Sequence, residues 1–109
     1  MRSKYHSRKI TRDGETFDSV KEYRRWCELK LLEQAGKIAD LKRQQKFELI
    51  PSQKVDRRVV ERPCTYIADF VYQEGGQTIV EDTKGFKTKD YIIKRKLLLY
   101  IHGIKVSEV

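Results

Sequence analysis

The residues with the clearest capacity for chemistry lie in one stretch, Ile79-Val80-Glu81-Asp82-Thr83-Lys84-Gly85. In an extended strand, residues two apart point to the same face, so Asp82 and Lys84 should project side by side while Glu81 and Thr83 face the other way. Such a carboxylate and ammonium can form a solvated ion pair of little energetic value. They can also serve a magnesium-dependent phosphodiesterase, in which the acid holds the metal and the lysine lies beside the attacking water or the scissile phosphate.

A second carboxylate, Asp69, interrupts an otherwise apolar strand predicted over residues 65–72. A charge there is costly unless it lies at the strand end, is paired, or coordinates a metal. The Gly75-Gly76 pair predicts a hairpin loop that folds this strand back on the strand predicted over 78–84. Position 69 would then lie roughly opposite positions 81 to 83.

Together, Asp69, Asp82 and the main-chain carbonyl of Thr83 would form an all-oxygen shell with room for water. Mg²⁺ favours that arrangement, and Mn²⁺ should substitute for it. Whether one or two ions bind is left open by the sequence. An ion pair across the hairpin is the structural alternative for the same residues.

Glu22 is a third candidate, and its position allows two interpretations. Ser19-Val-Lys-Glu22 has the spacing of a capping box, in which the glutamate bonds back to the serine amide at the start of a helix. Glu22 could instead face the two aspartates and assist the metal site. Spacing alone favours the cap.

The elements that must position these residues can be predicted from periodicity and turn residues. Consecutive strands joined by short turns should pair antiparallel, and a strand reached through a helix should lie parallel to a neighbour. The prediction is an α+β fold with a four-stranded mixed sheet flanked by helices. Its elements are a hairpin at 10–17, a helix at about 19–35, strands at 38–50, 65–72 and 78–84, a charged irregular loop at 52–62, a helix at about 89–101 and a last strand at 104–106.

Length and composition limit the function further. The chain has 109 residues, which suits one domain: a basic arm at 1–9, the small hairpin at 10–17 and a core at 18–109. No apolar run is long enough for a membrane span and no secretory signal is present. Cys27 and Cys64 lack zinc-site spacing and are expected to be part-buried thiols in a reducing cytoplasm.

The charge balance predicts a polyanionic partner. Lys and Arg total 24 against 16 acidic residues, a formal net charge of +8, and the basic residues cluster near the N-terminus and in residues 84–96. A dispersed basic surface without a partner is the alternative. The candidate DNA contacts are Lys4, Arg8, Lys9, Arg57, Arg58, Lys87, Lys89 and Lys94.

Glu22, then Tyr66-Ile67-Ala68-Asp69-Phe70, then Val80 to Gly85, in that order, resemble the PD-(D/E)XK nuclease superfamily. The chain is most similar to small phage- and prophage-encoded members grouped near Holliday-junction resolvases, over residues from about 17 to 105. Ala68 stands where the motif usually has proline.

The resemblance implies a restriction-endonuclease-like core and a role for each motif residue. Asp69 and Asp82 would be metal ligands, Lys84 the catalytic lysine and Glu22 the helix glutamate that assists the metal. Gln44 or Gln45 matches a polar accessory position of some relatives.

The function expected from all of this is a Mg²⁺-dependent endonuclease that cuts branched DNA as a homodimer. The chain has no module that reads base sequence, which fits recognition of DNA backbone and shape. A restriction-like, nicking or recombination-associated nuclease of the same fold is one alternative. A non-catalytic basic DNA-binding protein, whose acids are structural, is the other.

Overall fold

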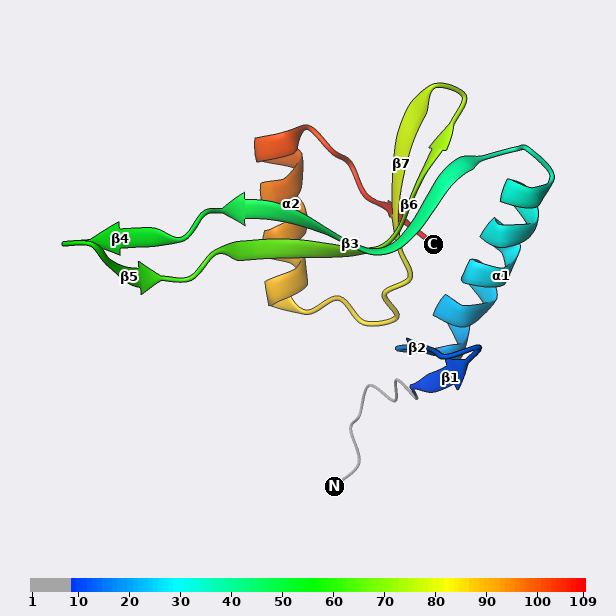
Figure 1. The fold of residues 1–109 in the computed structure, drawn as a ribbon, viewed down its shortest axis with the longest axis horizontal. Coiled ribbons are helices and arrows are strands. Elements are labelled where there is room, and N and C mark those ends of the chain that lie inside the picture. The colour runs from blue at the N-terminus through cyan, green and yellow to red at the C-terminus, as the bar shows by residue number, and fades with distance from the viewer. Residues whose placement is uncertain (1–8) are drawn as a thin grey trace.

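The computed structural model describes residues 9–109, and its two helices flank a sheet (Figure 1). In chain order the elements are β1 (Ile10–Arg12), β2 (Glu15–Phe17), α1 (Val20–Gln34), β3 (Ala39–Ile50), β4 (Gln53–Val55), β5 (Arg58–Glu61), β6 (Cys64–Glu74), β7 (Gln77–Asp82), α2 (Lys89–His102) and β8 (Ser107–Glu108). Within this part of the chain, no helix is long and apolar enough to cross a membrane.

The main sheet has four strands in the order β3-β6-β7-β8. The first two pairings are antiparallel and the last is parallel. The predicted mixed sheet with flanking helices is therefore confirmed. In the β6–β7 hairpin Phe70 pairs with Glu81. The next residue on each strand, one step farther from the turn, is Asp69 on β6 and Asp82 on β7, so the two aspartates lie at the same end of the hairpin.

The helices begin and end where polar caps permit. The side chain of Ser19 accepts a hydrogen bond from the Glu22 amide at the start of α1, and Thr88 does the same for Tyr91 at the start of α2. Helix α2 ends at Gly103, whose φ of 68° is a left-handed conformation that glycine adopts without steric cost. Both predicted helices are confirmed to within two residues.

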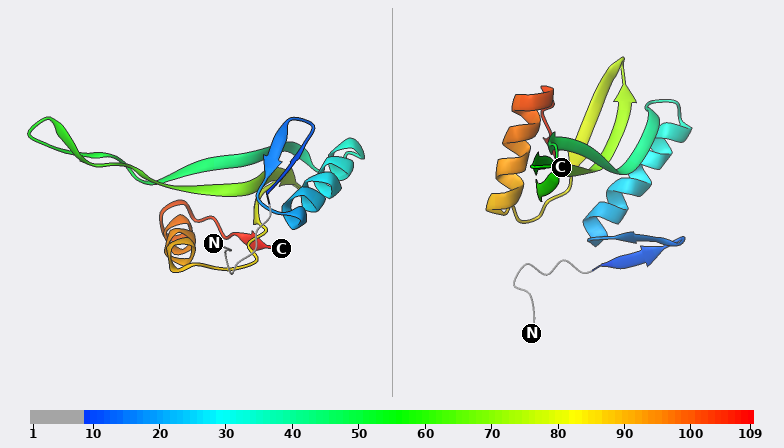
Figure 2. Two further views of the ribbon diagram at one scale, coloured as in Figure 1. Left: turned by 90° about the horizontal axis from the view of Figure 1, so that it is seen from below. Right: turned by 60° about the vertical axis from the view of Figure 1, so that its left-hand side comes forward.

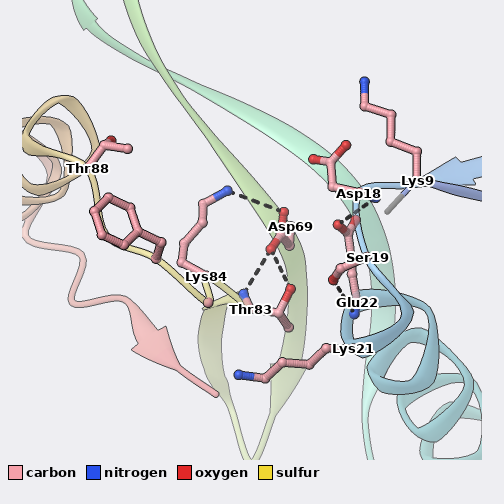
Figure 3. A pocket seen from close by; sticks show the side chains of 11 residues that line it. Lys9, Asp18, Ser19, Lys21, Glu22, Asp69, Thr83, Lys84 and Thr88 are labelled. Atoms are coloured by element: carbon pink, nitrogen blue, oxygen red, sulfur yellow. Dashed lines mark hydrogen bonds and ion pairs between the residues drawn. The ribbon is translucent and has the colours of Figure 1, made fainter. Parts of the chain in front are cut away.

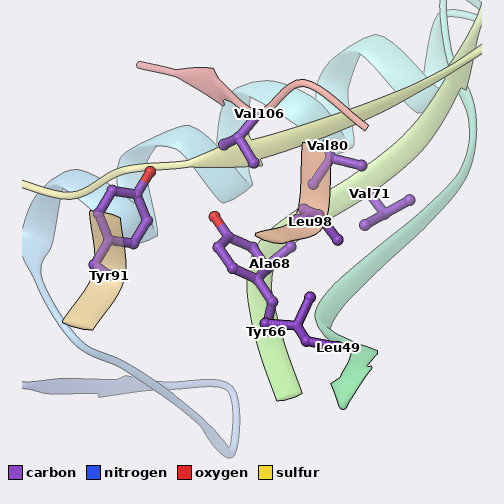
Figure 4. Close-up of a cluster of buried hydrophobic side chains, with 8 residues drawn as sticks. All are labelled: Leu49, Tyr66, Ala68, Val71, Val80, Tyr91, Leu98 and Val106. Atoms are coloured by element: carbon purple, nitrogen blue, oxygen red, sulfur yellow. The ribbon is translucent and has the colours of Figure 1, made fainter. Parts of the chain in front are cut away.

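Two apolar clusters hold the helices to the sheet. The larger lies under α2 and contains Leu49, Tyr66, Ala68, Val71, Val80, Tyr91, Leu98 and Val106 (Figure 4). The smaller lies under α1 and contains Leu29, Ile38, Phe70 and Tyr72, with Trp26 stacked on Phe70. Cys27 and Cys64 are free and half-buried, as predicted.

The prediction of an irregular loop over residues 52–62 is wrong, because β4 and β5 form a third hairpin there. Its turn is Asp56-Arg57, with φ values of 51° and 68°. The turns of the two predicted hairpins, Asp13-Gly14 and Gly75-Gly76, contain the glycine that marks such a turn in a sequence. The Asp56-Arg57 turn lacks glycine, so no local signal separated it from a loop.

The last strand was also misplaced, since β8 is Ser107–Glu108 and not residues 104–106. Val106 is buried and Ile104 packs against the core under α2, so the apolar residues anchor this segment. The residues after them then pair with Glu81 and Asp82. Similarly, β7 ends at Asp82, so Thr83 and Lys84, which the prediction placed within the strand at 78–84, lie just beyond it.

Glu81 is buried, at 2% exposure, and is held by Arg25 of α1. Two atoms of the guanidinium, Nε and Nη2, donate to the two carboxylate oxygens at 2.8 and 2.7 Å. The hydroxyl of Tyr72 also donates to Glu81. Burial and this bond raise the pKa of Tyr72 to about 12, so the phenol remains protonated and can donate to the carboxylate. Glu81 therefore serves to dock α1 on β7.

Replacing Arg25 with methionine should lower the free energy of unfolding by about 3–5 kcal/mol, because the Glu81 carboxylate stays buried without its counter-charge. Urea denaturation followed by circular dichroism measures this difference. Arg24→Met, at an exposed position of the same helix, is the matched control and should change the value by less than about 0.5 kcal/mol. Similar losses in the two variants would contradict the assigned role of the Arg25–Glu81 pair.

Candidate functional site

A pocket of about 560 Å³ lies where three separate parts of the chain meet (Figure 3). One wall comes from the start of α1, the floor from β6, and the other wall from the connection between β7 and α2. The lining residues are Lys9, Asp18, Ser19, Lys21, Glu22, Asp69, Thr83, Lys84, Gly85, Phe86 and Thr88.

Asp69 is the centre of the pocket floor, and its carboxylate fixes the segment that follows β7. Its Oδ2 accepts hydrogen bonds from the Thr83 amide at 2.8 Å and from the Thr83 hydroxyl at 2.9 Å. The Asp69 amide in turn donates to Oδ1 of Asp82 at 3.1 Å. The two aspartates are therefore tied together through the backbone of β6.

Lys84 lies against both aspartates. Its Nζ is 3.9 Å from Oδ1 of Asp69 and 3.8 Å from Oδ1 of Asp82. The lysine side chain is one-third exposed, so the ammonium faces the pocket as well as the acids. Asp69, Asp82 and Lys84, which the sequence predicted to share a site, are thus brought together by the fold.

Asp82 is fully buried, and one of its oxygens is unsatisfied. Within the described part of the chain, Oδ2 has no hydrogen-bond partner. Burial raises the pKa of Asp82 to about 6, against the lowering effects of Lys84 and of the Asp69 amide. A buried carboxylate with a free oxygen is an arrangement that a cation would stabilise.

The donor set fits a hard divalent cation that keeps water in its shell. Mg²⁺ is usually held by one or two carboxylates, with waters and substrate oxygens completing its coordination. Asp69 and Asp82 would supply the two carboxylates, although of the two only Asp69 lines the pocket. No cluster of three or more His, Cys, Asp or Glu side chains suited to a metal is found over residues 9–109. Thr83 meets Asp69 through its amide and hydroxyl, and its main-chain carbonyl as a further ligand stays a prediction.

Glu22 takes part in the helix cap, although its carboxylate accepts from the amide of Asp18 and not from the predicted Ser19 amide, and its assisting role at a metal stays a prediction. Its amide donates to Ser19 Oγ, and its carboxylate accepts from the amide of Asp18, one residue before the cap. Its other oxygen accepts from Arg43 at 3.3 Å and from Gln44 at 3.2 Å. Burial, and then the negative charge of Asp69, raise the pKa of Glu22. Glu22 is therefore a cap residue whose pKa also depends on the charge of Asp69.

The two candidate accessory glutamines, Gln44 and Gln45, have different surroundings. Gln44 reaches Glu22 from a position in β3 whose φ is 52°, between Arg43, which pairs with Phe70, and Gln45, which pairs with Ala68. Gln44 therefore lies across from Asp69. Gln45 does not line the pocket.

The predicted DNA contacts are spread over the molecule. Lys9 lines the pocket. Lys87 pairs with Glu108 at 3.4 Å and Lys94 with Asp90 at 3.6 Å, while Lys89 is the first residue of α2. Arg57 and Arg58 are at the tip of the β4–β5 hairpin, whereas Lys4 and Arg8 fall outside the described residues.

Sequence reasoning missed several residues that border the site. Lys21 and Thr88 line the pocket; Lys21 lies in the first turn of α1 and Thr88 is the cap of α2. Their only signal was their position at the start of a helix, since the pocket forms between distant segments. Arg43 was also missed: it lies 3.9 Å from the centre of the Phe17 ring and bonds Glu22, so it joins the β1–β2 hairpin to the site.

Replacing Asp82 with asparagine should stabilise the metal-free protein above about pH 6. Between its ordinary pKa of 3.8 and about 6, the folded chain holds a proton that the unfolded chain has released, so stability falls as pH rises through this window. Asparagine carries no charge and avoids that loss. The melting temperature in EDTA should therefore exceed that of the wild type by several degrees at pH 7–8, and the gain should shrink toward pH 4.

Thermal unfolding followed by circular dichroism over this pH range measures the effect. Asp40→Asn is the control, at an exposed position with a φ of 55° that asparagine also adopts. A variant at position 82 that is less stable than the wild type at every pH would contradict the unfavourable burial of the Asp82 charge.

Comparison with known proteins gives one match. No curated protein and no solved structure matches the chain. The family model described as "Protein of unknown function (DUF1064)" matches residues 2–106. This match includes every residue that lines the pocket and nearly the whole chain, and the chain therefore belongs to the DUF1064 family.

Proposed function

We propose that this chain is a metal-dependent endonuclease that hydrolyses DNA phosphodiester bonds on a restriction-endonuclease-like fold. The observation that carries the proposal is the contact of Lys84 with two buried, mutually bonded aspartates, of which Asp69 lines the pocket and Asp82 lies buried behind it. Burying two carboxylates side by side costs free energy, and one ammonium does not satisfy all of their oxygens. Such stored electrostatic strain is typical of functional sites.

In this proposal Asp69 and Asp82 hold Mg²⁺, or Mn²⁺ in its place. When bound, the ion would neutralise phosphate charge and lower the pKa of a coordinated water. Lys84 would stabilise the negative charge that develops on the phosphoryl oxygens and orient the attacking water. Glu22 lines the same pocket, and the negative charge of Asp69 contributes to raising its pKa. Its carboxyl group would therefore hold a water or a proton at the wall of the pocket formed by α1.

The surroundings of the pocket suit a polyanion. Lys9 and Lys21 line its rim together with Lys84, and the helix dipoles of α1 and α2 add positive potential because Ser19 and Thr88, the caps of both helices, line the pocket. A phosphodiester backbone would thus meet cations and two helix N-termini around a pair of acids. Branched DNA as the substrate, a homodimer as the active form and a cytoplasmic location remain predictions from the sequence.

The second candidate is a basic DNA-binding protein without catalysis. It is favoured by the pairing of Lys84 with both aspartates, which partly neutralises them without any metal. The two proposals differ in what the acids do, so they can be separated by variants at these positions.

The nuclease proposal predicts Mg²⁺-dependent nicking of supercoiled plasmid and cleavage of a four-way junction, with both lost in EDTA. Asp69→Asn and Asp82→Asn should abolish cleavage, and Lys84→Ala should reduce the rate by about 10²–10³-fold, since it removes one group that stabilises the transition state. Lys37→Ala, at an exposed position outside the pocket lining, is the control and should retain wild-type activity.

Several results would count against it. Equal cleavage in EDTA and in Mg²⁺ would contradict the assignment. DNA binding without nicking in either metal, unchanged in Asp69→Asn and Asp82→Asn, would favour the non-catalytic protein. Equal rates on the junction and on linear duplex would remove the branch preference alone.

A further inference from the structure

The β4–β5 hairpin forms an arm, residues 51–63, that projects away from the rest of the protein. It continues the long strands β3 and β6 beyond α2, on the side away from α1 (Figure 1, Figure 2). Every residue of the arm is exposed, and none belongs to either apolar cluster. A two-stranded hairpin of this kind is marginally stable by itself, so its length is not explained by folding of the core.

The arm carries more cations than acids, and its cations make no ion pair within the described part of the chain. Lys54, Arg57, Arg58 and Arg62 outnumber the acids Asp56 and Glu61, and over residues 9–109 none of the four makes an ion pair. Elsewhere the arginines that contact the site or core, Arg25, Arg43 and Arg95, are all paired with glutamates. The arm therefore presents positive charge to a partner outside this chain.

The turn at the tip of the arm has an arginine, Arg57, at a position where the backbone conformation would cost glycine less free energy. Arg57 has a φ of 68°, while Gly14 and Gly76 occupy the same position of the other two hairpin turns. A left-handed conformation costs an L-residue with a Cβ about 1–2 kcal/mol. Backbone strain of this kind is enriched at functional positions. Here the side chain is a guanidinium at the far end of the arm.

Neither face of the arm is an apolar seam. The cross-strand pairs place Val55 beside Arg58 on one face and Lys54 beside Val59 on the other. Self-association would favour a continuous apolar face, whereas this arrangement puts a cation and an aliphatic group on both sides. A two-stranded ribbon fits the major groove of B-DNA, where cations reach the phosphates of both walls and aliphatic side chains contact thymine methyl groups.

The reach of the arm sets the part of the DNA it could contact. Arg57 precedes Asp69 by 12 positions along nearly continuous strand. At about 3.3 Å per residue this is at most about 40 Å, close to the roughly 34 Å of one duplex turn. An arm tip at that distance would meet the flanking duplex and not the bond held in the pocket.

We propose that the arm is a duplex-DNA contact that engages the helix about one turn from the candidate active site, with Arg57 and Arg58 binding its phosphates. The inference rests on the proposed function for its choice of DNA. It adds a second anchoring point, which fixes the direction of the duplex across the pocket.

The test is equilibrium binding of the full chain to fluorescent duplexes of about 10 and 24 base pairs, in EDTA and over a range of salt. The double variant Arg57→Gly/Arg58→Gln removes both cations, and glycine suits the backbone at position 57, so its melting temperature should not fall. Its salt slope on the longer duplex should be smaller by about 2, since each phosphate contact contributes about 0.9. Its affinity for that duplex should fall about tenfold, with little change on the short duplex.

The control variant Lys37→Gln/Lys105→Gln removes the same charge from exposed positions outside the arm and should keep the wild-type slope. An unchanged slope in the arm variant overturns the inference, as does a wild type that binds neither duplex. Loss of a dimer in sedimentation velocity, with the slope retained, overturns it in favour of a second copy as the partner.

Because binding is measured without metal, this result is independent of cleavage. Arm-dependent binding by a chain that never nicks DNA supports the arm contact and removes the nuclease proposal. Nicking by a chain whose DNA binding does not depend on the arm supports the nuclease proposal and removes the arm contact.

Discussion

The burial of four carboxylates, three on the central strands of a small sheet and one on α1, is the constraint on which the rest of the structure depends. Glu22, Asp69, Glu81 and Asp82 are all nearly inaccessible to solvent. Each carboxylate needs a hydrogen-bond or ionic partner, because burying an unpaired charge costs a free energy comparable with the whole free energy of unfolding of a small domain. The compensation differs in kind from one acid to the next, and that difference separates structural from functional positions.

Glu81 has the most complete compensation. A bidentate guanidinium and a phenol saturate it, and the result joins α1 to the sheet. Asp69 is satisfied mainly by the residue that follows β7. Asp82 has the poorest compensation, with one oxygen unpartnered and a pKa near 6. Two adjacent acids, Glu81 and Asp82, thus face different environments because a strand alternates its sides.

Much of this could be predicted from residue patterns, within limits that have physical causes. Glycine-containing turns and polar helix caps are local signals, so the hairpins at Asp13-Gly14 and Gly75-Gly76 and both helices were placed correctly. The meeting of Asp69, Asp82 and Lys84 followed from the hairpin alone. The partner of Glu81 could not be predicted, because Arg25 lies 56 positions earlier and is brought in by α1 packing. The arm was missed because its turn contains Arg57 in place of glycine.

The pocket draws its walls from the start of α1, from β6 and from the segment after β7, which are far apart in sequence. These parts meet only after the long-range strand pairings have formed, and contacts of that kind arise late because closing the intervening loops costs entropy. A chain emerging during synthesis would carry Glu22 and Asp69 well before Lys84 could join them. We therefore expect the site to form all at once, with completion of the fold, so that a partly folded chain would lack the proposed activity.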